Sequence, residues 1–490
     1  MKSLTKTTVF ALAAILCFGQ FAMAQTDEDD LKFVRGFPTK ETAQKLYDEL
    51  DYQRAVQVYL RHIPAMSMYG FRRGIDEDLS GKAAQPQKVA LWENLLDAKT
   101  LLLTGNTEVL YSMTYLNLGE DGPTVLEVPP GVLGILDDMW MRYVADVGLG
   151  GADKGKGGKY LILPPDYKGD VPKGYYVERS TTYGVWVALR GFVVDGKTEK
   201  SAANLRTMKI YPLSKKDDPP AMDFVNATGK RVNTLMTEDY GYFEELAKLI
   251  NEEYEKSITA QEYGMLASIG IIKGKPFKPD ARMKKILERA ASTGVAMAKT
   301  LFLVNRDPNQ FIYPGRQWRT GWIGGDYTYM VGNYLYEDAQ IYFNWMATGN
   351  TPAMVKKTVG AGSQYLLASS DANGDPLDGG QLYKLTIGSN VPAKQFWSLI
   401  AYDIDSRSLL IRDDIPAGKD FPSISSYKDV KKNGDGSVDI YLGPKAPDGY
   451  EKNFIRTVPG KGYFVIFRLY GALEPYFDQS WKINDLVKVN

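Results

Sequence analysis

The spacing of hydrophobic and polar residues changes character several times along the chain. Over residues 39–104 apolar positions recur with a helical period, which predicts an N-terminal helical segment whose second helix spans about 87–103. Over residues 105–212 the pattern changes to short aromatic and β-branched runs separated by Gly and Pro. Strands at this spacing, without helices between them, are typical of an antiparallel β-sandwich.

Helical spacing returns at about residue 237 and lasts to about 304. Asp280 is a suitable N-cap for the second of these helices, because a carboxylate there accepts a backbone N–H of the first turn. We expect this helical segment, 213–305, to pack with residues 39–104. Strand patterns dominate again over 306–490, a length sufficient for a jelly-roll-like sandwich. The prediction is therefore a multidomain α+β protein, mainly β with a helical domain.

Residues 1–24 follow a pattern of their own. A basic start and a short apolar core precede Ala22-Met-Ala24, which together form the pattern of a secretory signal peptide. We expect cleavage near Ala24 and a periplasmic or secreted protein. No later segment offers about 20 consecutive apolar residues, so the pattern predicts no transmembrane segment.

The composition narrows the chemistry. The only cysteine, Cys17, lies in the predicted leader, so we expect neither disulfides nor cysteine-based catalysis after export. The 59 basic residues are balanced by 59 acidic residues, and the basic residues form no long run. We therefore expect no nucleic-acid partner. His62 is the only histidine, and its place near a helix end favours a structural role over a catalytic triad or a zinc site.

An acidic loop resembles a calcium site. Asp371, Asn373 and Asp375 stand at alternate positions, as oxygen ligands of calcium often do. An EF-hand would need Gly at the sixth position and Glu at the twelfth, where this chain has Pro376 and Leu382. Because turn chemistry explains these residues, we favour a structural turn, with calcium as the alternative. No other cofactor is expected.

Three charged residues stand on otherwise apolar strand faces: Arg190, Asp403 and Arg468. Side chains alternate along a strand, so Asp403 shares its face with Trp397. A charge on an apolar face needs a partner or a ligand. We favour intramolecular ion pairs or side chains exposed at a sheet edge, and keep ligand binding as the alternative.

Two further stretches invite a chemical interpretation and do not sustain it. Glu337 and Asp338 are adjacent carboxylates, but a strand would turn them to opposite faces. The glycine-rich stretch Gly148–Gly158 carries lysines, yet no helix signal follows it. A flexible hairpin loop explains it better than a phosphate-binding loop.

Several stretches occur in a characteristic order, among them LTGNTEVLYSMTYLNL, LASIGIIKGKPFKPD, DANGDPLDGGQLYKLTI and GYFVIFRLYGALEPYFDQSWKI. Together they resemble the paired DUF1254 and DUF1214 domains of exported bacterial proteins of unknown function. The resemblance implies an immunoglobulin-like β-sandwich, an α-helical insert and a C-terminal jelly roll, and it implies no activity. The family tends to show Asn-x-Asp-Thr-Leu-Tyr where this chain has Asn106-Thr-Glu108-Val-Leu-Tyr111. This chain therefore carries the longer side chain Glu108 where the family tends to carry Asp.

These observations leave two hypotheses. The first is a protein that binds a small molecule, a glycan or an envelope partner; the second is a hydrolase using carboxylate, tyrosine or arginine chemistry, with calcium as a further element. A pocket that joins Asn106, Glu108 and Arg190 would favour the hydrolase, and their separation would favour binding. The sequence leaves the oligomeric state open. The candidate ligand-binding residues are Asn106, Glu108, Tyr111, Arg190, Trp397, Asp403 and Arg468.

Overall fold

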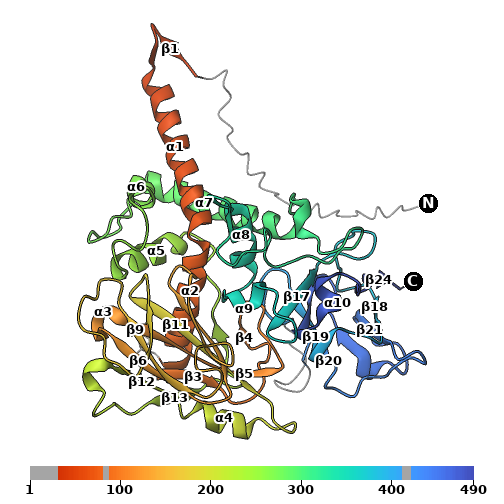
Figure 1. Cartoon of the computed structure of the whole chain (residues 1–490). Helices are drawn as coiled ribbons and strands as arrows, with labels where there is room; N and C mark the ends of the chain where they lie inside the picture. The colour runs from red at the N-terminus through yellow and green to blue at the C-terminus, as the bar shows by residue number, and fades with distance from the viewer. Residues whose placement is uncertain (1–30, 81–87, 411–420, 490) are drawn as a thin grey trace, which may run out of the picture. The chain divides into compact units, whose positions relative to one another are not determined.

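The computed structural model describes residues 31–80, 88–410 and 421–489 (Figure 1). The predicted signal peptide lies outside these ranges. The chain forms two compact units, residues 1–51 and 52–490. The described part of the first unit contains a small hairpin and the first turns of a long helix: β1 (Phe33–Val34), β2 (Phe37–Pro38) and α1 (Lys40–Arg61), which continues into the second unit.

Among the described residues, helices and strands contribute almost equally, at 27% and 28%. The chain is α+β, as expected, but the expectation that it is mainly β is wrong. The reason is that the two longest helices alone, α1 and α7, span 22 and 23 residues. The helices after α1 are α2 (Ile63–Ile75), α3 (Leu118–Asp121), α4 (Glu199–Leu205), α5 (Gly241–Glu252), α6 (Ala260–Ser268), α7 (Ala281–Leu303), α8 (Glu337–Met346), α9 (Pro352–Val355) and α10 (Glu474–Phe477).

The first strand block consists of a six-stranded and a four-stranded sheet, drawn in orange and yellow in Figure 1. The six-stranded sheet has the order β13 (Asp223–Asn226), β3 (Lys88–Trp92), β5 (Val109–Asn117), β11 (Gly184–Phe192), β7 (Leu133–Asp138) and β8 (Tyr143–Gly148). The four-stranded sheet has the order β10 (Tyr176–Arg179), β9 (Gly158–Leu163), β6 (Thr124–Val128) and β12 (Lys209–Pro212).

Alternation along β11 separates two apolar cores. Val185, Val187 and Leu189 pack into the core shared with the four-stranded sheet. Trp186 and Ala188 point to the opposite face and pack into the core shared with the helices. Most pairs are antiparallel, but β13 runs parallel to β3 and β10 runs parallel to β9.

Two sequence predictions fail in this block. Residues 88–92 form the strand β3, whereas the prediction placed a helix over 87–103 within the helical segment 39–104. A continuous apolar run carries no period, and pairing with β5 and β13 decides its conformation. The glycine-rich stretch joins β8 to β9, which belong to different sheets, so it is a crossover loop rather than a hairpin loop.

The helices of the second unit share one large core with the inner faces of the sheets. Tyr59 at the end of α1 stacks on Tyr242 of α5 with ring centroids 4.0 Å apart. Gly294 of α7 lies against Tyr59, where a Cβ would come within 2.3 Å of the ring. The Asp280 side chain accepts the backbone N–H of Met283, which confirms the predicted N-cap of α7.

The last strand block also consists of two sheets, drawn in teal to blue in Figure 1. Val465, Phe467 and Leu469 of β23 face the core between these sheets, whereas Ile466 and its neighbours of the same parity face the helices. The first of these sheets has the strand order β17 (Ser363–Ala368), β23 (Tyr463–Ala472), β19 (Ala393–Asp403) and β20 (Ser423–Ser425). The second has the order β22 (Phe454–Arg456), β21 (Val438–Gly443), β18 (Tyr383–Ile387) and β24 (Val487–Lys488). Two small pairs complete the described strands: β4 (Thr100–Leu101) with β14 (Val232–Asn233), and β15 (Met330–Val331) with β16 (Tyr334–Leu335).

The expected strand around Glu337 is a helix. Both acids lie in the first turn of α8, where a carboxylate interacts favourably with the helix dipole. Glu337 forms an ion pair with Arg61 at 2.6 Å, and Asp338 forms one with Arg306 at 3.1 Å. Each carboxylate therefore has a separate structural partner.

None of the helices within the described ranges combines the length and the apolar run that crossing a membrane requires.

Candidate ligand-binding site

A small cavity of about 40 Å³ is lined by residues from both strand blocks and from α8, and we call it the arginine cavity. Its polar lining includes Thr104, Asn106, Tyr111, Arg190 and Arg468. Its apolar lining includes Trp322, Phe343, Met346, Leu367 and Ile466.

Strand register directs both arginines to this cavity. Arg190 lies opposite Tyr111 of β5 on the face of the six-stranded sheet that packs against the helices. Arg468 lies between Tyr365 of β17 and Ser398 of β19 on the corresponding face of the last block. The two faces meet, so two cations that are distant in sequence share one cavity.

Arg468 is 4% exposed and only partly satisfied. Its Nη2 donates to the Thr104 carbonyl oxygen at 3.0 Å. Its buried Nη1 has no hydrogen-bond partner among the described residues. The guanidinium carbon lies 5.8 Å from the centre of the Tyr365 ring and 5.6 Å from that of Tyr402, so aromatic faces surround the charge.

Arg190 is partly buried and contacts aromatic rings rather than acids. Its guanidinium carbon lies 5.7 Å from the centre of the Tyr111 ring. Within the described part of the chain, it makes no hydrogen bond and no ion pair. Because a guanidinium stays protonated at any pH near neutral, the cavity holds two positive charges without a carboxylate in its described lining.

Asn106 shapes the loop that leads into β5. Its Oδ1 accepts the backbone N–H of Glu108 at 2.9 Å, and its Nδ2 donates to the Tyr470 hydroxyl at 2.7 Å. Its own N–H donates to the Tyr111 hydroxyl at 3.1 Å. These bonds fix the two tyrosines near the arginines, and they leave little hydrogen-bonding capacity on Asn106 for a ligand.

Glu108 belongs to the same loop but does not line the cavity. Its Oε2 accepts a hydrogen bond from Ser425 of β20 at 3.1 Å. Burial raises the pKa of its carboxyl group, and the charge of Lys428 offsets part of that rise. The cavity thus joins Asn106 and Arg190 and leaves out the carboxylate that the hydrolase hypothesis needs.

Trp397 and Asp403 lie elsewhere, on the face of β19 that packs inside the last block. Trp397 stacks on Phe467 with ring centroids 5.6 Å apart. The Asp403 Oδ1 accepts the backbone N–H groups of Asp405 and Ser406, and its Oδ2 lies 3.7 Å from the Lys461 ammonium. Asp403 caps a turn, and these two candidates are not part of the arginine cavity.

The acidic loop between β17 and β18 has the contacts of a turn. The buried Asp371 carboxylate accepts the backbone N–H groups of Asn373 and Asp375 at 2.9 and 3.1 Å. Gly374 between them has a φ of +87°, which favours glycine. Across residues 31–80, 88–410 and 421–489, no three His, Cys, Asp or Glu side chains form a group that could hold a metal ion.

His62 lies between α1 and α2 and is buried. Its Nδ1 is 2.8 Å from the Val58 carbonyl oxygen, one of the last acceptors of α1. Burial lowers the pKa of the imidazole, so the ring is neutral near pH 7. The ring makes a T-shaped contact with Trp140, with centroids 6.1 Å apart.

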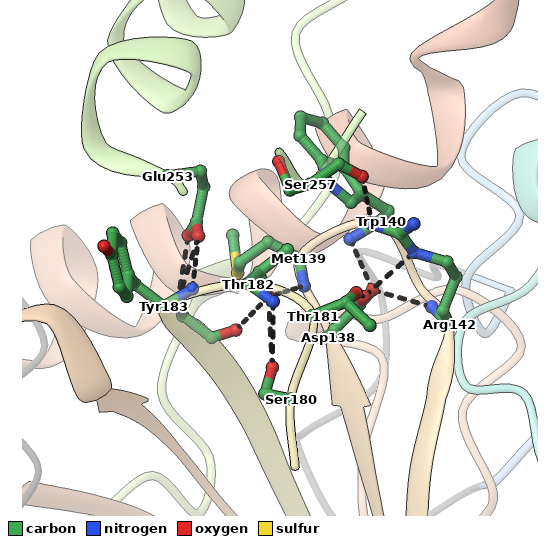
Figure 2. A network of polar contacts seen from close by, with 11 residues as sticks. Asp138, Met139, Trp140, Arg142, Ser180, Thr181, Thr182, Tyr183, Glu253 and Ser257 are labelled. Carbon is green, nitrogen blue, oxygen red and sulfur yellow. Dashed lines mark hydrogen bonds and ion pairs between the residues drawn. The ribbon is translucent and has the colours of Figure 1, made fainter. Parts of the chain in front are cut away.

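A second polar cluster, the Glu253–Asp138 network, was not identified from the sequence (Figure 2). Figure 2 shows the Glu253 carboxylate directed at the backbone where β11 begins, and it accepts the N–H of Tyr183 at 2.7 Å and that of Gly184 at 3.1 Å. The side chain lies just past α5 and is 2% exposed. Burial raises the pKa of Glu253 to about 7, although the backbone donors oppose the rise.

Asp138 is the second carboxylate of this network and is fully buried (Figure 2). Its Oδ1 accepts the backbone N–H groups of Trp140 and Arg142 at 2.8 and 2.9 Å. Its Oδ2 accepts from the Arg142 Nε at 2.9 Å and from the Thr181 hydroxyl. The signal that could have revealed it is the one used for Arg190, a charge within an apolar strand.

An open cleft of about 890 Å³ adjoins Glu253. Its charged and aromatic lining includes Tyr69, Arg72, Arg73, Tyr183, Glu252 and Glu253. Arg72 forms an ion pair with Glu252 at 2.5 Å, and Arg73 forms one with Glu245 at 2.5 Å. Both cations of this cleft are therefore neutralised within the protein, unlike those of the arginine cavity.

Comparison with known families bears on the same segments. Residues 86–212 match the family described as protein of unknown function (DUF1254), and residues 362–474 match protein of unknown function (DUF1214). Both families named by the resemblance thus match this chain, in the expected order. Asn106, Tyr111 and Arg190 lie in the DUF1254 match, whereas Leu367 and Arg468 lie in the DUF1214 match. The arginine cavity thus draws its lining from both.

Solved structures extend the likeness beyond the two matches. The crystal structure of the VPA0106 protein from Vibrio parahaemolyticus covers 90% of this chain and 100% of its own, with a TM-score of 0.53 and 19% identity. This likeness concerns the fold alone. An uncharacterised protein from Burkholderia cenocepacia covers 92% of this chain and 97% of its own at 11% identity, and its TM-score of 0.40 supports no argument. The comparison with curated proteins gave no match.

Proposed function

We propose that the protein binds a small anionic molecule in the arginine cavity. The observation that supports the proposal is the pair Arg190 and Arg468, two guanidinium groups that line one cavity without a carboxylate partner in its described lining. Burying a charge that the protein compensates only in part is costly, and an anionic ligand would reduce that cost. Guanidinium groups also match the planar geometry of small oxyanions and donate to them through charge-assisted hydrogen bonds.

The same lining argues for binding over hydrolysis. Its described side chains include neither a carboxylate nor an imidazole, so the cavity has no evident general base. Its volume of about 40 Å³ is far below the 300–1,000 Å³ typical of drug-sized ligands, which favours a small molecule over a glycan. A binding protein is the hypothesis that agrees best with these groups.

Acid–base chemistry at the open cleft is the second candidate. Glu253 has a pKa of about 7 and lines this cleft beside Arg72 and Tyr183, the residue types that the hydrolase hypothesis invoked. Both of its oxygens already accept backbone N–H groups, which favours a structural role and places this candidate second. Glu253→Gln should abolish turnover of chromogenic ester or glycoside substrates if the candidate is right and leave turnover unchanged if it is wrong.

Ligand binding can be tested by calorimetry and thermal unfolding with a panel of small anions. Arg190→Gln and Arg468→Lys should weaken binding at least tenfold, because each removes a charged or geometrically matched donor. Arg319→Lys is a matched control, since Arg319 is also 4% exposed and donates to a carbonyl, that of Phe302, but does not line the cavity. Equal affinity in all four proteins, or no binding by any anion, would overturn the proposal.

We also propose the finer fold and location that the resemblance and the leader pattern imply. These are an immunoglobulin-like sandwich at 105–212, a jelly roll at 306–490, and export to the periplasm or medium after cleavage near Ala24. The stacked sheets of both strand blocks support the first two proposals. An experimental structure tests the strand connections, and N-terminal sequencing of the fractionated protein tests the cleavage.

A further inference from the structure

We infer that the ligand of the arginine cavity is a short-chain aliphatic monocarboxylate, whose carboxylate contacts Arg190 and Arg468 and whose carbon chain lies against Ile466, Leu367 and Phe343. This inference rests on the proposed function and adds the chemical class of the ligand. Three features of the cavity carry it: the position of the free donors, the nature of the remaining walls, and the volume.

The free donors are concentrated on the two guanidinium groups. Nη1 of Arg468 is buried without a partner within the described residues, while Nη2 of the same group is held by the Thr104 carbonyl oxygen. This bond fixes the plane of the guanidinium and hence the direction of its unused N–H groups. Arg190 has all its donors available in the described structure. An anion with two oxygens in this cavity can therefore accept hydrogen bonds from both guanidinium groups.

One part of the remaining wall offers carbon rather than polar atoms. Ile466 and Leu367 project from β23 and β17, and Phe343 and Met346 project from α8. A tetrahedral oxyanion such as phosphate would direct some of its oxygens at these side chains. Burying a polar group without a partner is unfavourable, and more so when the group is charged. A carboxylate avoids this cost because its two oxygens lie at one end and its chain is apolar.

The volume limits the chain length. A water-sized group needs roughly 10–15 Å³ of cavity volume, so the cavity of about 40 Å³ accepts about three such groups. The carboxylate takes the space of about one, which leaves room for about one to three further carbon atoms. Acetate, propionate and butyrate are therefore the expected size range, and hexanoate exceeds it.

The test is a titration of the full chain, by calorimetry and by melting temperature, with probes that vary one property each. The probes are formate, acetate, propionate, butyrate and hexanoate as sodium salts, propionamide as the neutral counterpart of propionate, and sodium phosphate and sulfate. We expect affinity to rise from formate to propionate or butyrate and to fall at least tenfold for hexanoate. Propionamide should bind at least tenfold more weakly than propionate, because it lacks the charge.

A cavity variant sharpens the chain-length test. Ile466→Ala should move the optimum to a longer carboxylate, since it removes carbon atoms from the apolar lining of the cavity, and Arg319→Lys should leave the optimum unchanged. The comparison of propionate with propionamide needs only the unaltered protein, so the inference stays testable if a variant fails to fold.

Failure of the inference and failure of the proposed function give different results. Binding of phosphate or sulfate that depends on Arg468, without binding of any carboxylate, would overturn the carboxylate class and retain an anion site. Equal affinity for propionate and propionamide would also overturn the class. If no probe binds, or if binding is unchanged in Arg190→Gln and Arg468→Lys, both the inference and the proposed function fall.

Discussion

The arginine cavity and the Glu253–Asp138 network both bury charged side chains, but they differ in how many hydrogen-bond partners the protein supplies to them. In the network, each carboxylate accepts two backbone N–H groups, and Asp138 also pairs with Arg142. In the cavity, Arg468 keeps an unpaired Nη1, and Arg190 has no polar partner in the described structure. A charge whose partners are all supplied by the protein serves the fold, whereas a charge left without them is available to a ligand.

The largest expected effect comes from removing Asp138, a buried carboxylate whose hydrogen-bond partners the protein supplies. Asp138→Ala leaves two backbone N–H groups and the Arg142 side chain without their acceptor. Removing one partner of a buried, charged hydrogen-bond network typically costs about 3–5 kcal/mol. We expect a loss of this size in urea unfolding monitored by circular dichroism.

The matched control for that change is Asp217→Ala, because Asp217 pairs with Lys216 on the surface and its side chain is 88% exposed. Surface pairs contribute little, so the urea midpoint of this variant should not move. A loss below about 1 kcal/mol for Asp138→Ala would show that the network is not the structural tie described above.

A second test of the network uses pH. The pKa of Glu253 is raised from 4.5 to about 7 in the folded protein, so the folded state binds this proton more tightly than the unfolded chain does. The stability that this proton contributes is present below about pH 4.5 and is lost as the pH rises to about 7. The full effect is about 3 kcal/mol, because each pH unit between the two pKa values corresponds to roughly 1.4 kcal/mol.

The measurement is urea unfolding from pH 4.5 to 8 for the unaltered protein and for Glu253→Gln, which cannot titrate. The difference between the two unfolding free energies isolates Glu253 from the buried His62, whose lowered pKa acts with the opposite sign. A difference that stays constant over this range would contradict the raised pKa of Glu253.

For the arginine cavity, we expect that removing a cation changes the free energy of unfolding little and does not lower it. Arg190→Met removes an unpaired, partly buried cation and keeps most of the apolar stem. Without ligand we expect an unfolding free energy that is unchanged or raised by up to about 1 kcal/mol. Carboxylate-induced stabilisation should disappear in the same variant. Thermal and urea unfolding with and without propionate measure both quantities, and a loss above about 2 kcal/mol without ligand would mean that Arg190 is structural.

The smallest expected effect concerns the acidic loop. Asp371 already directs its Oδ1 at the backbone N–H groups of Asn373 and Asp375, while the Asp375 side chain is exposed. Asp375→Asn should be nearly neutral, because Asn suits turns as well as Asp does. Calcium should not raise the melting temperature, and chelator should not lower it. A calcium-dependent rise of several degrees that Asp375→Asn removes would establish a metal site and reopen the calcium-assisted enzyme.

The part of the site that could be predicted from the sequence is the pair of arginines, because side chains alternate along a strand. Arg190 and Arg468 each interrupt an apolar face, so the sequence marks both as buried charges in need of a partner. Asp403 satisfied the same criterion, yet it caps a turn in the last block. Tyr365 and Phe343, which complete the cavity, carry no local signal, because an aromatic residue in a strand or helix packs into a core in most cases.

The end of α5 shows where such reasoning stops. Glu252 and Glu253 are neighbours of the same type, but the Glu252 side chain is 49% exposed in an ion pair, whereas Glu253 is 2% exposed. Only the approach of β11 distinguishes them. The same limit applies to the conformation of residues 88–92. They form an uninterrupted apolar run, and pairing with β5 and β13 makes them a strand.

The sequence by itself determines the periods of the elements, the parity of each charged residue on its strand, the N-cap of α7, and the scarcity of cysteine and histidine chemistry. These properties depend on residues a few positions apart, and short-range geometry suffices to deduce them. The tertiary structure decides which faces meet, which carboxylates find donors, and that the two arginines share one cavity. Those outcomes depend on packing between segments far apart in the chain, where burial and the need to pair every polar group act together.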